Sequence, residues 1–81
     1  MMTFNEALVK RINEICAQKN ITISQFALRA GITPSAIYDI RNKGKNPNII
    51  TLKKLCDRNK ISIREFFEPD YINNASVEDD F

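Results

Sequence analysis

Side chains suited to covalent or metal chemistry are scarce in this chain of 81 residues. It has no histidine, and its two cysteines, Cys16 and Cys56, stand 40 positions apart and form no C-x-x-C pair. Without histidine the chain lacks the usual general base and the usual partner of a serine or cysteine nucleophile. Two cysteines do not suffice for a zinc site. We therefore expect no enzyme activity, no metal and no cofactor, and we interpret both cysteines as reduced core thiols.

The charged side chains indicate a different chemistry, the binding of a polyanion. Residues 1–67 contain all twelve lysines and arginines against five carboxylates, a net charge of +7. Residues 68–81 contain five carboxylates and no base. The formal net charge of +2 thus combines a basic body with an acidic tail. A basic body is typical of proteins that bind nucleic acids, but lysine-rich solvated faces occur elsewhere too.

The element that would present these charges lies in residues 22–42, TISQFALRAGITPSAIYDIRN. Gly31 can adopt the positive φ required where a helix stops sharply, and Ala27 leaves room for a second helix to cross closely. Thr33 is predicted to cap the second helix, and Pro34 suits its first turn because no backbone N–H is needed there. This pattern is that of a helix-turn-helix, whose second helix lies in the major groove of DNA. An ordinary corner between two helices is the alternative.

Five helices are predicted from apolar residues at helical spacing. Their expected ranges are Phe4 to Gln18, Ile23 to Ala30, Pro34 to Asn42, Ile49 to Arg58 and Ile63 to Phe67. Three capping boxes are predicted, each with Ser or Thr three residues before Glu or Gln: Thr3 with Glu6, Thr22 with Gln25, and Ser62 with Glu65. Asn48 is predicted to cap the fourth helix.

The apolar faces of these helices can enclose one core, as expected for a single small domain. The predicted core residues are Leu8, Ile12, Ile15, Phe26, Ala27, Ile37, Ile40, Leu52, Leu55 and Phe66. No apolar run reaches the ~18 residues of a membrane span. The first ten residues lack the basic and apolar regions of a signal peptide. We therefore expect a cytoplasmic protein without a membrane partner.

The stretch from Phe4 to Phe67 resembles the helix-turn-helix domain of the Xre family, the group of lambda Cro and the lambdoid phage repressors. The matching features are the A-x-x-x-G of Ala27 and Gly31, the Ile-x-x-Ile of Ile37 and Ile40, Asn46-Pro47 before a capped helix, and the closing segment TLKKLCDRNKISIREFF. The resemblance implies an all-α, five-helix, lambda-repressor-like domain. We place this domain at residues 1–68, with an acidic tail at residues 69–81.

The resemblance also implies a binding site for double-stranded DNA. Residues of the third predicted helix that map to positions facing base edges are Pro34, Ser35, Ala36, Tyr38 and Asp39. Residues that map to phosphate contacts are Thr33, Asn42, Lys43, Lys45 and Asn46. The Ser35 hydroxyl can donate to a base or accept from it, Ala36 can meet a thymine methyl, and Asp39 can accept from a cytosine amino group. No small-molecule ligand is evident.

The chain departs from the family pattern at two positions. Ile23 stands where many relatives carry a glutamine that grips a phosphate, so we interpret Gln25 as a capping residue only. Lys43 stands where relatives often have glycine, and Gly44 follows it, which leaves the end of the third helix open. Four site residues also have a purely structural interpretation. Lys43 and Lys45 are then solvated side chains of a loop, and Tyr38 is an exposed aromatic residue without a role. Asp39 then forms an ion pair with Lys43.

Two functional hypotheses follow. The first is a sequence-specific transcriptional regulator, a repressor, that works as a homodimer on two half-sites, because one small domain buries little DNA. Its predicted dimer contact is the last helix and the tail, with Phe67, Tyr71 and Ile72, although the tail is also compatible with disorder or with folding back onto the body. The second is a protein-interaction module, antitoxin-like or an anti-regulator, in which residues 78–80 mimic phosphates or contact a basic partner.

Overall fold

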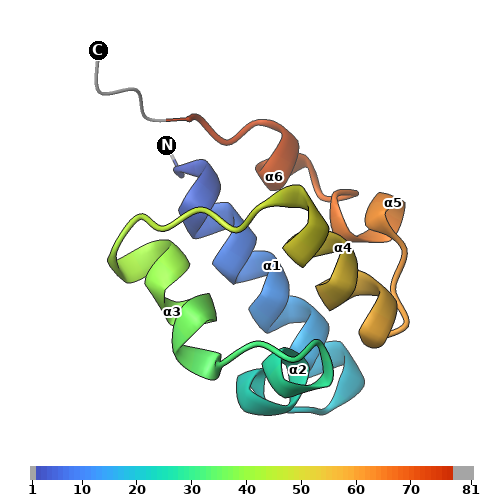
Figure 1. Ribbon diagram of the computed structural model, residues 1–81. Helices are drawn as coiled ribbons and strands as arrows, with labels where there is room; N and C mark the ends of the chain where they lie inside the picture. The colour runs from blue at the N-terminus through green and yellow to red at the C-terminus, as the bar shows by residue number, and fades with distance from the viewer. Residues whose placement is uncertain (1, 78–81) are drawn as a thin grey trace.

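The computed structural model describes residues 2–77, and this part of the chain forms six helices (Figure 1). They are α1 (Phe4–Lys19), α2 (Ile23–Arg29), α3 (Pro34–Asn42), α4 (Ile49–Arg58), α5 (Ile63–Phe66) and α6 (Asp70–Asn73). The predicted all-α, lambda-repressor-like fold class is confirmed. The expected number of five helices is corrected, because α6 forms within the predicted tail. The acidic residues Glu78, Asp79 and Asp80 lie outside the described residues.

Hydrogen bonds at the helix starts follow the sequence closely. Complete capping boxes are present at Thr3–Glu6 and at Thr22–Gln25. The Asn48 side chain accepts from the Thr51 N–H over 2.8 Å, as predicted. At α5 the Ser62 hydroxyl accepts from the Glu65 N–H, but the Glu65 carboxylate accepts from the Ser62 hydroxyl and not from its backbone. The predicted box at α5 is therefore half formed.

Three helices, α1, α2 and α4, end in the same backbone arrangement. Each is followed by a residue of positive φ, then by isoleucine, and then by the Thr or Ser that precedes the next helix. The residues of positive φ are Asn20 (55°), Gly31 (71°) and Lys60 (61°). The isoleucine N–H donates over 3.0 Å to the carbonyl of a small buried residue five positions earlier, which is Cys16, Ala27 or Cys56. These bonds define Schellman endings, and we call the three turns the α1–α2, α2–α3 and α4–α5 corners.

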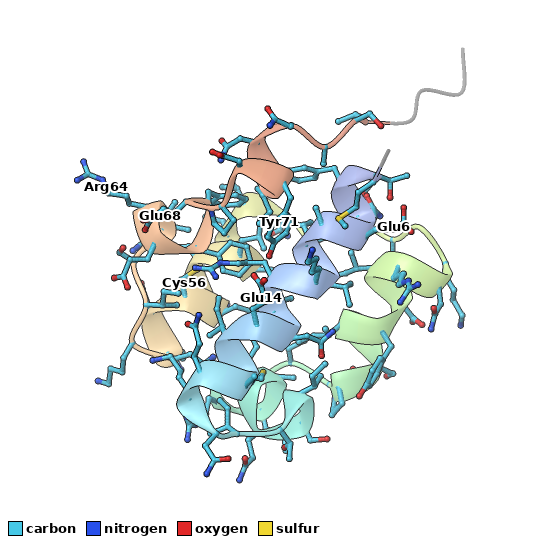
Figure 2. All side chains as sticks on the ribbon, turned by 180° about the vertical axis from the view of Figure 1, so that it is seen from behind. Glu6, Glu14, Cys56, Arg64, Glu68 and Tyr71 are labelled. Carbon is cyan, nitrogen blue, oxygen red and sulfur yellow. The ribbon has the colours of Figure 1, made fainter. Side chains whose placement is uncertain are left out.

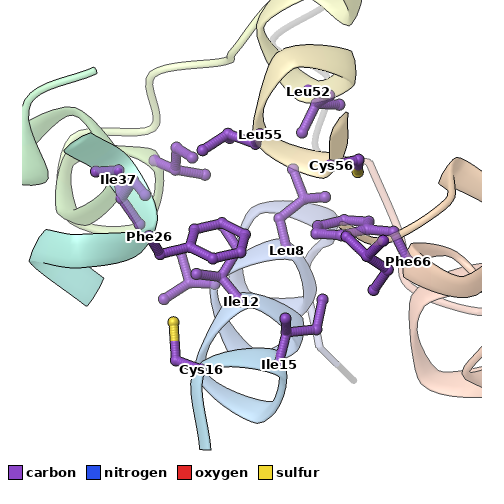
Figure 3. Packing of buried hydrophobic residues seen from close by; sticks show 14 of the residues in the cluster. Leu8, Ile12, Ile15, Cys16, Phe26, Ile37, Leu52, Leu55, Cys56 and Phe66 are labelled. Carbon is purple, nitrogen blue, oxygen red and sulfur yellow. The ribbon is translucent and has the colours of Figure 1, made fainter. Parts of the chain in front are cut away.

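The helices enclose one hydrophobic core (Figure 3). All ten predicted core residues are buried, and Phe26 and Phe66 are fully so. Cys16 and Cys56 are free and buried in the same cluster. Burial raises the pKa of the Cys56 thiol to about 11, with a further contribution from the neighbouring carboxylate of Asp57. Both thiols therefore stay protonated at neutral pH.

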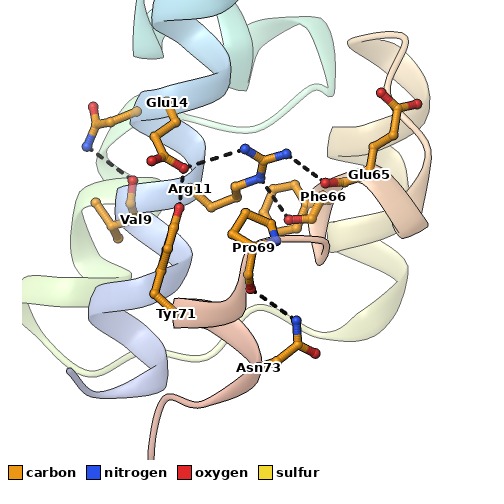
Figure 4. Close-up of polar contacts among 9 residues, drawn as sticks. Val9, Arg11, Glu14, Glu65, Phe66, Pro69, Tyr71 and Asn73 are labelled. Carbon is orange, nitrogen blue, oxygen red and sulfur yellow. Dashed lines mark hydrogen bonds and ion pairs between the residues drawn. The ribbon is translucent and has the colours of Figure 1, made fainter. Parts of the chain in front are cut away.

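A polar network connects α1 with α5 and α6 (Figure 4). The Arg11 guanidinium, 9% exposed, donates to the carbonyl of Phe66 over 2.9 Å and to that of Glu65 over 2.6 Å. It also pairs with the carboxylate of Glu14, which accepts from the Tyr71 hydroxyl. These contacts connect α1 with α5 and with α6.

Tyr71 and Ile72 fold back onto the body, which was one of the alternatives for the tail. Burial, together with the hydrogen bond to Glu14, raises the pKa of Tyr71. Ile72 is only 2% exposed and belongs to the core. The expectation that Ile72 contacts a second copy is therefore corrected, because its own chain already covers it.

Candidate nucleic-acid interface

The helix α3 has one face in the core and one face in solvent. Ile37 and Ile40 are buried, and α3 packs against α1 and α2. The opposite face is open, with Ser35 and Ala36 exposed and Tyr38 48% exposed. The fold thus holds a short helix rigidly by its apolar side and presents its polar side outward.

The first turn of α3 differs from the sequence prediction. Thr33 occupies the N-cap position, but its side chain makes no capping hydrogen bond. Pro34 has no N–H, and the Ala36 N–H donates to the Thr33 carbonyl over 3.0 Å. The Thr33 hydroxyl instead lies 3.3 Å from the Ser35 hydroxyl. The predicted cap is therefore corrected, and this pair of exposed hydroxyls keeps hydrogen-bonding capacity for a partner outside the chain.

A groove of about 400 Å³ runs along the start of α3, between this helix and the loop that leads to α4. Six of the predicted DNA-binding residues line it: Thr33, Ser35, Ala36, Asp39, Lys45 and Asn46. Four of these come from α3 and its N-cap, three of them with polar or charged side chains, and two come from the loop. We call this depression the α3 groove.

The end of α3 is defined by Gly44. Lys43 ends the helix with φ −121°, and Gly44 takes the left-handed conformation with φ 62°. The N–H groups of Lys43 and Lys45 both donate to the Asp39 carbonyl, over 3.0 and 3.2 Å. Gly44 therefore provides the glycine turn one residue later than in the family pattern, and the chain folds back at once toward α4.

Two site lysines differ in their surroundings. The Lys43 ammonium lies 3.9 Å from the Asp39 carboxylate, so the ion pair that the sequence offered as an alternative is present. The Lys43 side chain is nevertheless 65% exposed, and such an exposed pair contributes little to stability. Lys45 is exposed beside the α3 groove. Both cations are thus open to an anionic partner.

Asn5, in the first turn of α1, holds the loop after α3. Its side-chain amide donates to the Ile40 carbonyl over 2.8 Å and to the Asn46 side-chain oxygen over 3.1 Å. The Asn46 side-chain oxygen therefore accepts one hydrogen bond within the chain, while the residue as a whole is exposed. The sequence analysis missed Asn5, because the contact joins positions 41 residues apart and leaves no local pattern.

A second, wider depression of about 770 Å³ lies between the start of α1 and the end of α3. We call it the α1–α3 hollow. Predicted site residues Asn42, Lys43 and Asn46 line it, together with Arg41, which the sequence analysis missed. Arg41 was open to prediction, because it follows the exposed Tyr38 by three positions and so shares its side of the helix.

Glu6 lies on the α3 side of α1 and also lines this hollow (Figure 2). Its pKa is lowered, first by hydrogen bonds with the backbone and hydroxyl of Thr3 and then by the charge of Arg41. Its negative charge is therefore engaged within the chain, and Arg41, Lys43 and Lys45 remain exposed around the end of α3.

Pro34 and Tyr38 line neither depression. Pro34 is half-buried at the first position of α3. Gln25 accepts from the Thr22 N–H over 2.9 Å, which agrees with its interpretation as a capping residue. Within residues 2–77, no three His, Cys, Asp or Glu side chains gather as metal ligands would. None of the helices in the same range has the length and apolar content needed to span a membrane.

A family model described as helix-turn-helix matches residues 12–66, which is roughly two thirds of the chain. The match includes the whole of α2, the α2–α3 corner and α3, and extends to the end of α5. It leaves out the start of α1 and all of α6. No curated protein matches the chain.

Proposed function

This chain belongs to the Xre-like helix-turn-helix family, and from that premise we propose that it is a sequence-specific regulator of transcription that represses its targets. The family is one of DNA-binding regulatory domains. Repression requires only that the protein occupy a promoter. We further propose that residues 1–68 form the DNA-binding domain and that α3 enters the major groove.

The observation that carries this proposal is the uncapped start of α3. The Thr33 and Ser35 hydroxyls lie side by side on exposed residues and cap no helix, although the equivalent hydroxyls of Thr22 and Ser62 cap their own helices. Exposed donors and acceptors at the start of a helix suit contacts with base edges and phosphates. The same groove includes the cation of Lys45, as an anionic duplex requires.

Binding would proceed in two parts. The cations Arg41, Lys43 and Lys45 attract the phosphate backbone without regard to sequence, and counterion release makes this part depend steeply on salt. Ser35, Ala36 and Asp39 then contact base edges and supply the preference for one sequence. Proline and tyrosine form no bidentate pairs with bases, so we expect DNA shape to contribute to the preference as well.

We propose that the working form is a homodimer on two half-sites. A single domain of this size contacts too little DNA for tight binding. The half-exposed residues of α5 and its surroundings, including Phe67, are the candidates for the contact, since Ile72 is buried. A duplex that carries two selected half-sites should bind much more tightly than a duplex with one, as measured by fluorescence anisotropy.

The charge contribution is tested with Lys45→Ala. This variant should bind every duplex more weakly, and the slope of log affinity against log salt should fall by about 1. Arg58→Ala is the matched control, because Arg58 is an exposed cation in the last turn of α4 and lines neither the α3 groove nor the α1–α3 hollow. Equal losses for the two variants would show that net charge alone is responsible and would contradict a DNA site at α3.

The sequence preference is tested with Ser35→Ala. Duplexes are first selected from a random pool by the wild-type protein. For Ser35→Ala, the difference in binding free energy between selected and unselected duplexes should shrink by about 1–3 kcal/mol. Nonspecific affinity should change little, because no cation is removed. If selected and unselected duplexes keep their ratio of affinities in Ser35→Ala and in Asp39→Asn alike, α3 does not contact the bases.

A further inference from the structure

The side chain of Asn5 spans the turn that ends α3. Its amide group donates to the Ile40 carbonyl over 2.8 Å and to the Asn46 side-chain oxygen over 3.1 Å. These two acceptors stand on either side of Gly44, whose left-handed conformation, with φ 62°, reverses the chain. One amide group on α1 therefore joins both ends of the turn formed by residues 40–46.

The bond to Ile40 satisfies a carbonyl that α3 leaves over. Ile40 lies in the last turn of α3, where carbonyls have no N–H partner within the helix. The N–H groups that follow, those of Lys43 and Lys45, both donate to Asp39 instead. The Asn5 side chain is half-buried, so it acts as a capping group that another helix supplies from the edge of the core.

The bond to Asn46 has a different character, which a comparison with Asn59 brings out. Asn59, 1% exposed, donates to the carbonyls of Phe26 and Leu55, in the last turns of α2 and α4. Both acceptors are backbone groups, so Asn59 serves only the packing of helices. Asn5 also holds an exposed side chain, whose ordering costs conformational entropy and adds little to stability. Such ordering is useful where a partner must find the side chain already in place.

We propose that Asn5 is a positioning residue for DNA binding, which fixes the turn of residues 40–46 so that Asn46 stands ready for a phosphate group. The inference rests on the proposed function. Because the Asn46 oxygen accepts from Asn5, its NH2 group is the part of the side chain left to donate to an anion. Asn46 lines both the α3 groove and the α1–α3 hollow, next to Lys45 in the chain. A contact that is ordered beforehand costs the duplex less on binding.

The first test compares two asparagines of α1. Asn5→Ala should bind a duplex of random sequence about fivefold more weakly than the wild-type protein, the equivalent of one hydrogen bond. Asn13→Ala is the matched control, because Asn13 donates to the Val9 carbonyl within α1 and lines neither depression. This control should bind as the wild-type protein does. Equal affinities for the two variants would overturn the inference and leave the proposed function standing.

A double-mutant cycle tests whether Asn5 acts through Asn46. Asn46→Ala alone should weaken binding about fivefold, and the addition of Asn5→Ala should then weaken it by less than about twofold. Two losses that multiply to about 25-fold would show that the residues act independently, and the inference would fail. Anisotropy titrations of the four proteins at one salt concentration measure the cycle.

A measurement without DNA separates this inference from the proposed function. The Lys45 N–H, bonded to Asp39 over 3.2 Å, reports on the turn, and the Ile61 N–H, bonded to Cys56 over 3.0 Å, reports on the α4–α5 corner. In Asn5→Ala, hydrogen exchange should become about fivefold faster at Lys45 relative to Ile61. An equal change at both amides would show a loss of overall stability and overturn the inference even if the wild-type protein binds DNA. A wild-type protein that binds no duplex would instead overturn the proposed function, whatever the exchange rates.

Discussion

The α2–α3 and α4–α5 corners have the same backbone and different starts for the helix that follows. In both, an isoleucine N–H donates over 3.0 Å to a small buried residue, Ala27 or Cys56. In the α4–α5 corner, the Ser62 hydroxyl then caps α5. In the α2–α3 corner, the Thr33 hydroxyl leaves α3 uncapped and meets Ser35 instead.

The two corners differ in the hydrogen-bonding groups that the start of the following helix leaves without a partner in the chain. A capped helix start has satisfied its own donors, so it contributes stability and offers little to a ligand. An uncapped start leaves donors for another molecule, at some cost in stability. Of these two corners, only the one before α3 leaves its helix uncapped, and this corner adjoins the α3 groove.

The largest expected effect concerns Gly31. Its backbone has φ 71°, a conformation that costs free energy for a residue with a Cβ. A Cβ added at Gly31 would meet no atom within 4 Å, so Gly31→Ala isolates the cost of a positive φ. We expect the free energy of unfolding to fall by about 1–2 kcal/mol. Urea denaturation measures it. An unchanged midpoint would show that the α2–α3 corner does not depend on glycine.

The next effect tests the caps directly. Ser62→Ala should lower the free energy of unfolding by about 1 kcal/mol, because it removes the cap of α5. Thr33→Ala should cost clearly less, since no capping bond is lost, but it should weaken DNA binding. The two variants are measured side by side by urea denaturation and anisotropy. Equal losses of stability would erase the contrast between the corners.

A smaller effect of opposite sign is expected at Lys60. This lysine adopts φ 61° in the α4–α5 corner, where glycine would be strained less. Lys60→Gly should raise the free energy of unfolding by about 0.5–1 kcal/mol, after the greater freedom of glycine in the unfolded chain is counted. DNA binding should change little, because Lys60 lies in the corner before α5. A loss of stability would show that the lysine side chain makes a contribution larger than its backbone strain.

The smallest effect on the free energy of unfolding is expected at Cys56, and it appears only at alkaline pH. The carbonyl of Cys56 accepts the hydrogen bond that closes the α4–α5 corner. Its thiol has a pKa raised from 9.0 to about 11 in the folded protein, so the unfolded chain loses this proton first. The thiol's contribution to stability is therefore full below pH 9 and is lost as the pH rises toward 11. Cys56→Ala should show a shallower alkaline decline than the wild-type protein, under reducing conditions. An identical decline would contradict the raised pKa.

Local patterns in the sequence predicted most of the fold. Helical spacing and capping residues depend on neighbours three or four positions apart, so α1 to α5 and the core could be predicted. The sixth helix could not, because Ile72 is held by contacts with distant α1 and by the Tyr71–Glu14 bond across 57 positions.

One part of the proposed site could be predicted in the same way. The exposed face of α3 follows from helical spacing around the buried Ile37 and Ile40. The failed cap at Thr33 was not predictable, because Thr22 and Thr33 have the same residue type and the same place in their corners. The clasp of Asn5 on the loop after α3 joins distant positions and also required the structure.

The backbone bonds between Met2, Phe4 and Ser76 bring two far-separated parts of the polypeptide to one place. A short glycine-rich peptide between residues 77 and 2 would therefore close the described chain into a ring without distorting it. Reopening that ring after Lys60 would give a circular permutant with the same architecture. Its new ends would lie in the α4–α5 corner, so labels or fused domains attached there would leave the exposed face of α3 unobstructed.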